Sequence, residues 1–367
     1  METKRVLKPK PMGWRRAIRR YLGVNPIRSG IQAAFLMLIL WIGVEFHDFL
    51  EFHRHASPED VLAGDGPMRP PGVEGFLPIS GLIGLKDWII RGALNDVHPA
   101  AVVLLLLFVA LSWMLRKSFC SWICPVGALS EYLWKLGRFL FGRTLSPWRW
   151  LDISLRSLKY LLMFFFLYAV LWSMDGASIR SFIESPYNRV ADVKMYDFFA
   201  RISAFAAKAL LVLALLSVLI KNFWCRYLCP YGALLGLFSR LSPTAIRRDP
   251  ASCIECGKCA VACPSGLPVD CSVVVRSAEC TGCLDCITVC PVTPALQVRT
   301  SSLGQTHSIP AFAAAVVLVF LLGVGLARIT GHWQNSVTAE EYRYRLKEID
   351  SPLYTHPGGR VAHGASE

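Results

Sequence analysis

Residues 101–129 read AVVLLLLFVALSWMLRKSFCSWICPVGAL, an apolar run that ends in a Cys-x-x-x-Cys-Pro phrase. A second phrase, CRYLCPYGAL at residues 225–234, also follows an apolar run. Both phrases continue Pro-x-Gly-Ala-Leu, and both follow basic and aromatic residues, RKSF and KNFW. Such an internal repeat indicates two related halves of one structure.

The composition is that of a membrane protein. The 367 residues are 54% hydrophobic and 18% charged, with a mean hydropathy of +0.42, which is too apolar for an ordinary soluble protein. Runs such as AVVLLLLFVAL lack the polar face that a helix of a soluble core usually shows. Five runs approach the roughly 20 residues that cross a bilayer: Ile31–Phe46, His98–Leu115, Leu158–Met174, Ile202–Ile220 and Ile309–Ala327. The first and third runs are short, and aromatic residues such as Trp41, Tyr160 and Trp172 extend them.

The basic residues predict the orientation in the membrane. The first thirty residues hold nine Lys or Arg and one acid, without the short apolar segment and cleavage site of a signal peptide. The Arg116–Lys159 connection and the segment after Lys221 are also basic, whereas Glu51–Asp96 is acidic. The positive-inside rule then predicts a multi-pass protein of the bacterial inner membrane, with a cytoplasmic N-terminus and a periplasmic C-terminal tail. Because the charge alternates with the spans, it indicates membrane topology rather than nucleic-acid binding.

Two tandem runs, CIECGKCAVACP at 253–264 and CTGCLDCITVCP at 280–291, fit the C-x2-C-x2-C-x3-C-P pattern of bacterial two-cluster ferredoxins. In this pattern the fourth cysteine of each run ligates the other cluster. Zinc would need only one group of four thiols, so two complete runs favour iron–sulfur clusters. Cys271 lies outside both spacings and is predicted to be a buried free thiol. The two predicted ligand sets are Cys253, Cys256, Cys259 and Cys290 for one [4Fe–4S] cluster, and Cys280, Cys283, Cys286 and Cys263 for the second.

The four cysteines of the repeated phrases each follow a span that runs inward, so they are predicted at the cytoplasmic edge of the bilayer. If each phrase is helical, its two cysteines lie on one face. Three interpretations remain open: ligands of a further metal or cluster, redox-active dithiols, or structural cysteines at a helix end. The residues concerned are Cys120, Cys124, Cys225 and Cys229.

The two phrases and the two ferredoxin runs together resemble the NapH/NosR group of membrane ferredoxins over roughly Val102 to Val298. The resemblance implies a membrane electron-transfer subunit that passes electrons between the quinone pool, cytoplasmic clusters and a periplasmic reductase or its maturation. The chain departs from the larger members because it has no added periplasmic flavin-binding domain. A flavin role is therefore unsupported.

The predicted outer connection begins VEFHDFLEFHRH, which would place His47, Glu51 and His55 on one helix face. Together with His98 they could bind a metal or exchange protons with a quinol, although a solvated interfacial helix end explains them equally simply. Residues 69–92, rich in Pro and Gly, are predicted to form an amphipathic or re-entrant segment. No Cys-x-x-Cys-His phrase and no Gly-rich nucleotide loop occurs, which argues against covalent haem and a built-in NAD site.

The sequence therefore predicts an all-α polytopic membrane protein of about five transmembrane helices with a small α+β two-cluster ferredoxin insert. The resemblance implies that the protein is an electron-relay subunit of a redox complex rather than a stand-alone enzyme. A quinone is a further candidate cofactor. The alternatives are metal (copper) reduction or metalloenzyme maturation through the Cys-x-x-x-Cys-Pro cysteines, and a redox sensor, for which no output domain is visible. Basic residues near the insert would favour an acidic soluble electron carrier: Lys221, Arg226, Arg247 and Arg248. The predicted domains are a basic arm (1–30), a four-span domain (31–244), the ferredoxin (245–300), a fifth span (301–330) and a tail (331–367).

Overall fold

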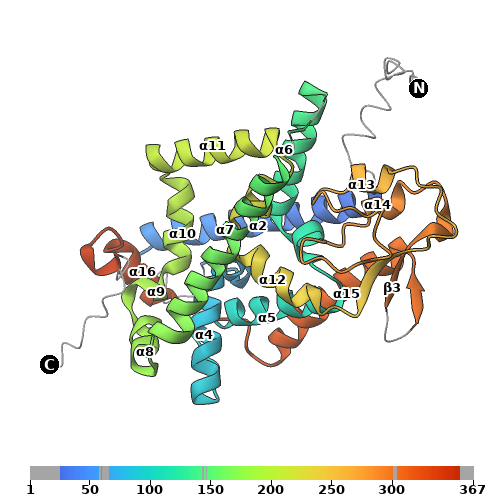
Figure 1. Cartoon of the computed structure of the whole chain (residues 1–367). Helices are drawn as coiled ribbons and strands as arrows, with labels where there is room; N and C mark the ends of the chain where they lie inside the picture. Colours follow the sequence, from blue (N-terminus) through green and yellow to red (C-terminus); the bar gives the residue numbers. More distant parts are fainter. Residues whose placement is uncertain are drawn as a thin grey trace.

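The structure, a computed structural model, describes residues 25–57, 59, 66–142, 144–145, 147–300 and 304–355 (Figure 1). Most of the predicted basic arm, up to residue 24, and the end of the tail from residue 356 lie outside these ranges. The described chain is mostly helical. Its helices are α2 (Pro26–His55), η1 (Pro71–Phe76), α4 (Pro78–Arg91), α5 (Pro99–Met114), η2 (Phe119–Ile123), α6 (Pro125–Phe141), α7 (Arg149–Tyr168), η3 (Ala169–Ser173), α8 (Gly176–Glu184), α9 (Pro186–Arg189), α10 (Ala191–Ala200), α11 (Ala204–Leu219), η4 (Trp224–Leu228), α12 (Pro230–Arg240), α13 (Lys258–Ala262), α14 (Asp285–Thr288), η5 (Thr293–Ala295), α15 (Ile309–Ile329), α16 (Ala339–Lys347) and η6 (Pro352–Tyr354).

Three of the five predicted spans form helices that are long and apolar enough to cross a membrane. They are α2 with 30 residues, Trp150–Ser173 with 24 and α15 with 21. The predicted second span forms α5, whose 16 residues rise only about 24 Å, short of a typical apolar layer of about 30 Å. The predicted fourth span forms α11, which meets α10 at a bend of 77°. The structure therefore supports three candidate spans, or four if the bent pair counts as one, and not the five that were predicted.

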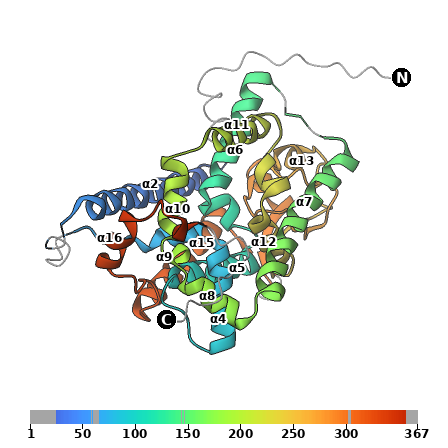
Figure 2. The same cartoon turned by 90° about the vertical axis from the view of Figure 1, so that its left-hand side faces the viewer.

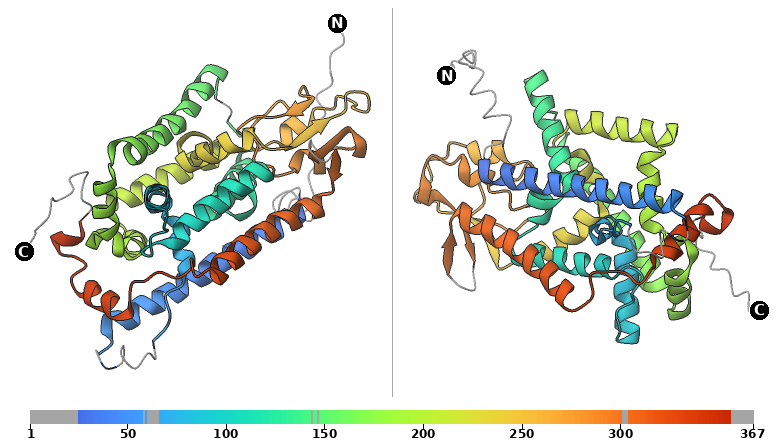
Figure 3. Two further views of the ribbon diagram at one scale, coloured as in Figure 1. Left: turned by 90° about the horizontal axis from the view of Figure 1, so that it is seen from below. Right: turned by 180° about the vertical axis from the view of Figure 1, so that it is seen from behind.

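The long helices place the ferredoxin segment and the C-terminal helix at opposite ends of the molecule. α2 and α15 both extend from the sheet toward the end of the molecule that holds α16 (Figure 3, left), and they diverge from each other on the way (Figure 3, right). The Phe35 and Phe320 rings meet edge to face at 5.0 Å between these two helices. Figure 2 shows α6 and α11 together on one side of the molecule, away from α4 and α8. A side chain at Gly137 in α6 would lie 1.8 Å from the carbonyl oxygen of Val218, so glycine permits this close packing of α6 against α11.

The ferredoxin segment contains a small antiparallel sheet with the order β2-β1-β3-β4. In the central pair Ile246 lies opposite Val298, and both side chains are buried. The two cysteine runs lie on loops outside the sheet, and α13 and α14 are one short helix in each run. The sheet therefore supports loops that carry the cysteines. The strands are β1 (Thr244–Arg248), β2 (Val274–Val275), β3 (Leu296–Thr300) and β4 (Gln305–His307).

The tail folds back onto the membrane helices. Tyr342 and Leu346 of α16 are buried in one cluster with Phe46 and Leu50 of α2. Glu341 pairs with Arg189 of α9 at 3.1 Å. The short helix α16 is thus held by contacts within the same chain.

Candidate functional site

The repeated phrase folds the same way in both halves. Each begins with a single π-helical turn, η2 or η4, in which the second cysteine donates its backbone N–H to the carbonyl five residues earlier. The distance is 2.9 Å from Cys124 to Phe119 and 3.0 Å from Cys229 to Trp224. That cysteine then caps a helix whose first residue is the proline of the phrase, where the missing N–H of proline has no cost. The sequence analysis considered a helical phrase with both cysteines on one face; the chain forms a π turn, a rare geometry that is frequent at functional sites.

The Pro-x-Gly part of the phrase places backbone N–H groups next to the sulfur of the second cysteine. The N–H of Gly232 lies 3.2 Å from Sγ of Cys229, and backbone N–H groups of Val126 and Gly127 likewise face the thiol of Cys124. Hydrogen bonds of this kind stabilise thiolates and tune the potentials of iron–sulfur centres. In both halves, backbone N–H groups thus face the sulfur of the second cysteine.

The two glycines of the phrases differ in how closely they are packed, and this predicts different effects of substitution. A Cβ at Gly127 would lie 2.1 Å from the carbonyl oxygen of Cys120, whereas one at Gly232 would meet nothing closer than Sγ of Cys229 at 3.5 Å. We expect Gly127→Ala to lower the free energy of unfolding by about 1–3 kcal/mol. Gly232→Ala should change it by less than about 1 kcal/mol. Thermal unfolding of the two purified variants compares them, and equal losses would show that the close approach at Gly127 is not real.

All four phrase cysteines line a single cavity of about 1180 Å³. Burial and the nearby thiols of Cys229, Cys124 and Cys120 raise the pKa of Cys225, which places thiols of both halves near one another. Burial raises the pKa of Cys120 to about 12 and that of Cys124 to about 11, so neither is a reactive thiolate near neutral pH. This disfavours a freely reactive dithiol and suits thiols whose protons are displaced by a bound cation.

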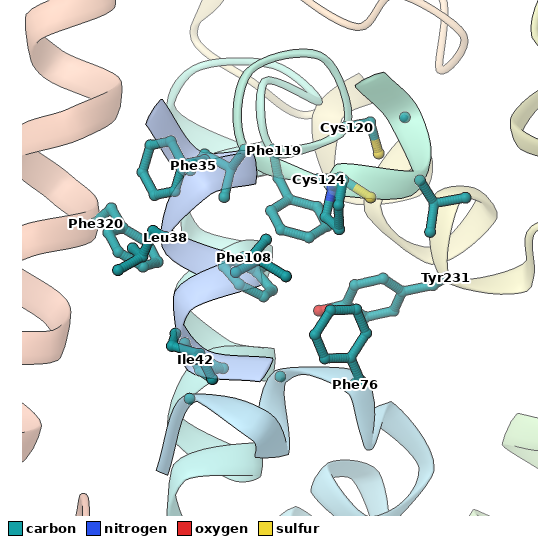
Figure 4. Close-up of a pocket in the computed structure, with 18 of the residues that line it drawn as sticks. Phe35, Leu38, Ile42, Phe76, Phe108, Phe119, Cys120, Cys124, Tyr231 and Phe320 are labelled. Atoms are coloured by element: carbon teal, nitrogen blue, oxygen red, sulfur yellow. The ribbon is translucent and has the colours of Figure 1, made fainter. Parts of the chain in front are cut away.

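The cavity extends from these thiols along α2. Figure 4 shows Cys120 and Cys124 at one end, Phe76 at the other, and Leu38 and Ile42 along the wall. Its lining is mostly aromatic and aliphatic, as is usual for a site that binds an apolar ligand. This cavity could not be predicted from sequence motifs, because its walls come from α2, α5, α12 and α15, which are distant in the chain.

The eight ferredoxin cysteines line two small cavities, four to each. Cys253, Cys256, Cys259 and Cys290 line one small cavity. Cys263, Cys280, Cys283 and Cys286 line another. Within the described ranges, no three or more His, Cys, Asp or Glu side chains are arranged to hold a single metal ion.

The loops of the two groups share an unusual backbone. The residues on either side of the middle cysteine have positive φ in both runs: Glu255 and Gly257 around Cys256, and Gly282 and Leu284 around Cys283. Left-handed residues of this kind turn successive N–H groups toward one point and form the concave nests found at many iron–sulfur sites. Because Glu255 and Leu284 are not glycines, they adopt this conformation at a steric cost. The residues present therefore fit [4Fe–4S] clusters.

Cys271, predicted to be a buried thiol, is exposed. It follows Pro268 in a turn between the two runs, where its N–H donates to the Pro268 carbonyl at 3.3 Å. The prediction was wrong because the loop buries Leu267 and Val269 in the core and leaves the Cys271 thiol on its outside.

The second ferredoxin run docks on the first repeated phrase. The side chains of the phrase donate hydrogen bonds to backbone carbonyls in and just before the run, so the two motifs are fixed against each other. These bonds are Ser121 Oγ to Thr281 O at 2.6 Å, Trp122 Nε1 to Gly282 O at 2.9 Å, and an Arg116 guanidinium nitrogen to Ser277 O at 2.7 Å.

Buried ion pairs fix the same junction, and the sequence analysis missed them. Arg28 of α2 is fully buried and pairs with Glu131 at 2.6 Å and with Asp285 at 3.0 Å. Burial alone would raise the pKa of Glu131, but Arg28 and Lys135 lower it to about 2. For Asp285 burial prevails and raises the pKa to about 6. A second pair joins Lys159 to Glu279, next to Cys280, at 2.6 Å. A charged residue inside an apolar helix, such as Lys159, was the available sign.

The predicted outer-face residues contact different partners in the structure. His47 Nδ1 lies 2.7 Å from the Tyr196 hydroxyl, and the exposed His55 is 3.6 Å from Glu51. His98 is buried elsewhere, with Nδ1 3.4 Å from Glu74. His98 thus has partners of its own, and its participation in an outer-face site stays a prediction.

The predicted basic surface is partly engaged within the chain. Lys221 donates to the carbonyl oxygens of Val261 and Cys263, and Arg226 pairs with Asp152 at 2.8 Å. These two residues position the ferredoxin segment and α7 rather than standing free for a partner. Arg247 and Arg248 lie on β1.

Comparison with known proteins supports an iron–sulfur assignment. A 4Fe–4S binding domain model matches residues 97–144 and 205–249, and a 4Fe–4S dicluster domain model matches residues 245–291. The first match contains both Cys-x-x-x-Cys-Pro phrases, and the second contains the eight ferredoxin cysteines. No solved structure matches the chain significantly.

Several curated proteins are similar to this chain. The putative electron transport protein YccM of Escherichia coli is 42% identical over 334 residues, which cover 90% of this chain and 91% of YccM. Protein NirI of Paracoccus denitrificans is 30% identical over 65% of this chain and 35% of its own length. The ferredoxin-type protein NapH of E. coli is 27% identical over 48% of this chain and 59% of NapH. With its apolar helices and its iron–sulfur motifs, the chain belongs to the NapH/NosR-type 4Fe–4S ferredoxin family.

Proposed function

We propose that this iron–sulfur electron transport protein is a membrane-bound relay. It would carry electrons between the quinone pool or a cytoplasmic donor and a respiratory or periplasmic redox partner. The similarity to YccM, NirI and NapH supports electron transfer with other redox subunits. The basic connections favour the bacterial inner membrane, with the ferredoxin segment cytoplasmic and the tail periplasmic.

The two groups of four cysteines would each hold one [4Fe–4S] cluster, with Cys290 and Cys263 as the exchanged ligands. When bound, such clusters supply one-electron oxidation and reduction. The protein contributes the thiolates and the left-handed loops whose N–H groups face them. Two separate cavities, each lined by one predicted group, support this assignment.

The observation that carries the proposal is the contact between the second run and the first repeated phrase. Trp122 donates to Gly282 O between Cys280 and Cys283, while Cys120 and Cys124 on either side of Trp122 line the large cavity. The chain thus links a predicted cluster site directly to an apolar cavity among its long helices. That connection suits an exchange of electrons with a lipid-soluble carrier such as a quinone.

The cysteines of the repeated phrases would form a further redox or metal centre between the ferredoxin and this cavity. Three observations support a cluster there. Both phrases form a π turn, and backbone N–H groups face the sulfur atoms of Cys124 and Cys229. A 4Fe–4S binding domain model also matches both phrases.

Metal analysis tests the proposal. Anaerobically purified protein should contain about eight irons and eight acid-labile sulfides for two cubane clusters, and about twelve of each if the phrase cysteines hold a third. In a variant with Cys120, Cys124, Cys225 and Cys229 all replaced by serine, the count should return to about eight. Zinc in place of iron and sulfide would refute the relay.

A second candidate function, reduction of a metal such as copper or maturation of a metalloenzyme, is favoured by the same four half-buried thiols around one cavity. The four-serine variant also separates the two functions. If it reduces quinone analogues at the normal rate but has lost metal reduction, the result supports a metal-reducing function of these four cysteines.

A further inference from the structure

The large cavity is long rather than round. Both Arg28 and Asp48 line it, and these residues are twenty positions apart on the continuous helix α2, a rise of about 30 Å. Aromatic and aliphatic side chains cover most of the wall between them, including Phe35 and Ile42. A cavity of this length and apolarity fits an elongated molecule with an apolar tail better than a compact polar one.

The end of the cavity that holds the thiols, its inner end, also carries two polar side chains from the same position of the repeat. The end near Phe76 is its outer end. Lys117 and Asn222 each stand three residues before the first cysteine of a phrase, and both line the cavity. Lys117 is only 3% exposed, and its charge faces Cys120 and Glu279. Asn222 Oδ1 is buried without a hydrogen-bond partner among the described residues.

Lys117 and Asn222 offer opposite hydrogen-bonding groups. The ammonium of Lys117 is a donor only, and Asn222 Oδ1 is an acceptor. A buried polar group with no partner is costly unless a ligand or water satisfies it. The repeat has therefore placed one donor and one unpaired acceptor beside the four thiols.

The outer end of the cavity has no comparable pair. Arg69 is already ion-paired with Asp192 at 2.6 Å and with Glu74 at 2.9 Å. Trp41 donates to Glu45 at 2.8 Å. The charge of Arg69 is thus already paired within the chain, although its Nη1 has no hydrogen-bond partner among the described residues.

We propose that Lys117 and Asn222 bind the ring oxygens of a lipid-soluble quinone at the inner end of the cavity, with its tail along α2. This inference rests on the proposed relay function and assigns the position of its membrane carrier. Lys117 donates a hydrogen bond to one ring oxygen, and Asn222 Oδ1 accepts one from a hydroxyl of the reduced ring. The apolar wall binds the tail.

A binding measurement on the full-length protein in quinone-free nanodiscs tests the site. The probe is a fluorescent hydroxyquinoline N-oxide, a quinone analogue whose fluorescence falls on binding. We expect Lys117→Met to weaken binding about ten-fold or more, as for loss of a charged hydrogen bond, and Asn222→Leu to weaken it about three-fold or more. Lys117→Arg, which keeps the donor, should stay within about three-fold of the original protein. Lys208→Met on the exposed face of α11 is the matched control and should change nothing.

Iron content and cluster reduction by dithionite, measured on the same samples, report the relay separately. The inference is overturned if Lys117→Met keeps full iron and full affinity. It is also overturned if the original protein has reducible clusters but binds no analogue, or if the cavity retains only phospholipid that the analogue does not displace. In each of these cases the clusters themselves remain, so the relay would need another donor. If the original protein contained no iron, by contrast, the proposed relay function itself would be refuted.

Discussion

Replacing Cys290 by serine should remove one cluster and leave the other. Cys290 is in the second run but lines the small cavity of the first, with Cys253, Cys256 and Cys259. Iron should therefore fall from about eight to about four atoms per ferredoxin segment. The surviving cluster should be the one held by the rest of the second run. Iron and sulfide analysis, with electron paramagnetic resonance of the reduced protein, measures both effects.

The reciprocal variant and a neutral one complete this experiment. Cys263→Ser in the first run should remove the second cluster, because Cys263 lines the cavity with Cys280, Cys283 and Cys286. The exposed Cys271 lies in neither group, so Cys271→Ser should keep all the iron. If Cys290→Ser instead eliminated the signal of its own run, the exchange of ligands would be wrong.

The cysteine groups could be predicted from the sequence because their geometry is local. Spacings of two and three residues bring thiols around a centre whatever the rest of the fold does, and the proline after each run turns the chain away. Gly257 and Gly282 also indicate tight turns, because glycine readily adopts positive φ. The positive φ of Glu255 and Leu284 could not be predicted, because residues of these types seldom adopt it and nothing in the sequence marks the exception.

The helix lengths could be predicted only in part. An apolar run predicts a helix but not where a bend interrupts it. Ser203 caps α11 by accepting from the Ala206 N–H at 3.2 Å, and this cap separates α11 from α10. Likewise α5 ends where Arg116 takes a positive φ, so the chain turns into the first phrase before the helix reaches span length.

The partners of buried charges could not be predicted at all. Arg28 and Asp285 are 257 residues apart, and in the sequence Arg28 is one more base in a basic arm. His98 looked like a member of an outer-face set, yet its Nε2 lies 2.6 Å from the Asn188 carbonyl. Such contacts depend on how helices pack, which hydrophobic periodicity does not specify.

Arg28→Met should destabilise the junction between the membrane helices and the ferredoxin segment. Arg28 is fully buried, and its guanidinium is the group that joins α2 to Glu131 in α6 and to Asp285 beside the cluster ligands. Removing one member of a buried ion-pair network leaves an uncompensated charge and costs about 3–5 kcal/mol. The temperature at which the visible absorbance of the clusters is lost should fall, and protease should cut near β1 at lower enzyme concentration.

A double variant distinguishes the charge from the shape of Arg28. Arg28→Met with Asp285→Asn removes one cation and one anion, and it leaves Glu131 paired with Lys135. Because no charge then remains buried without a partner, most of the lost stability should return. Asp350→Asn breaks an exposed pair with Arg201 and should cost less than about 1 kcal/mol. If the double variant is no more stable than Arg28→Met, the packing of the Arg28 side chain, rather than its charge, holds the ferredoxin segment to the helices.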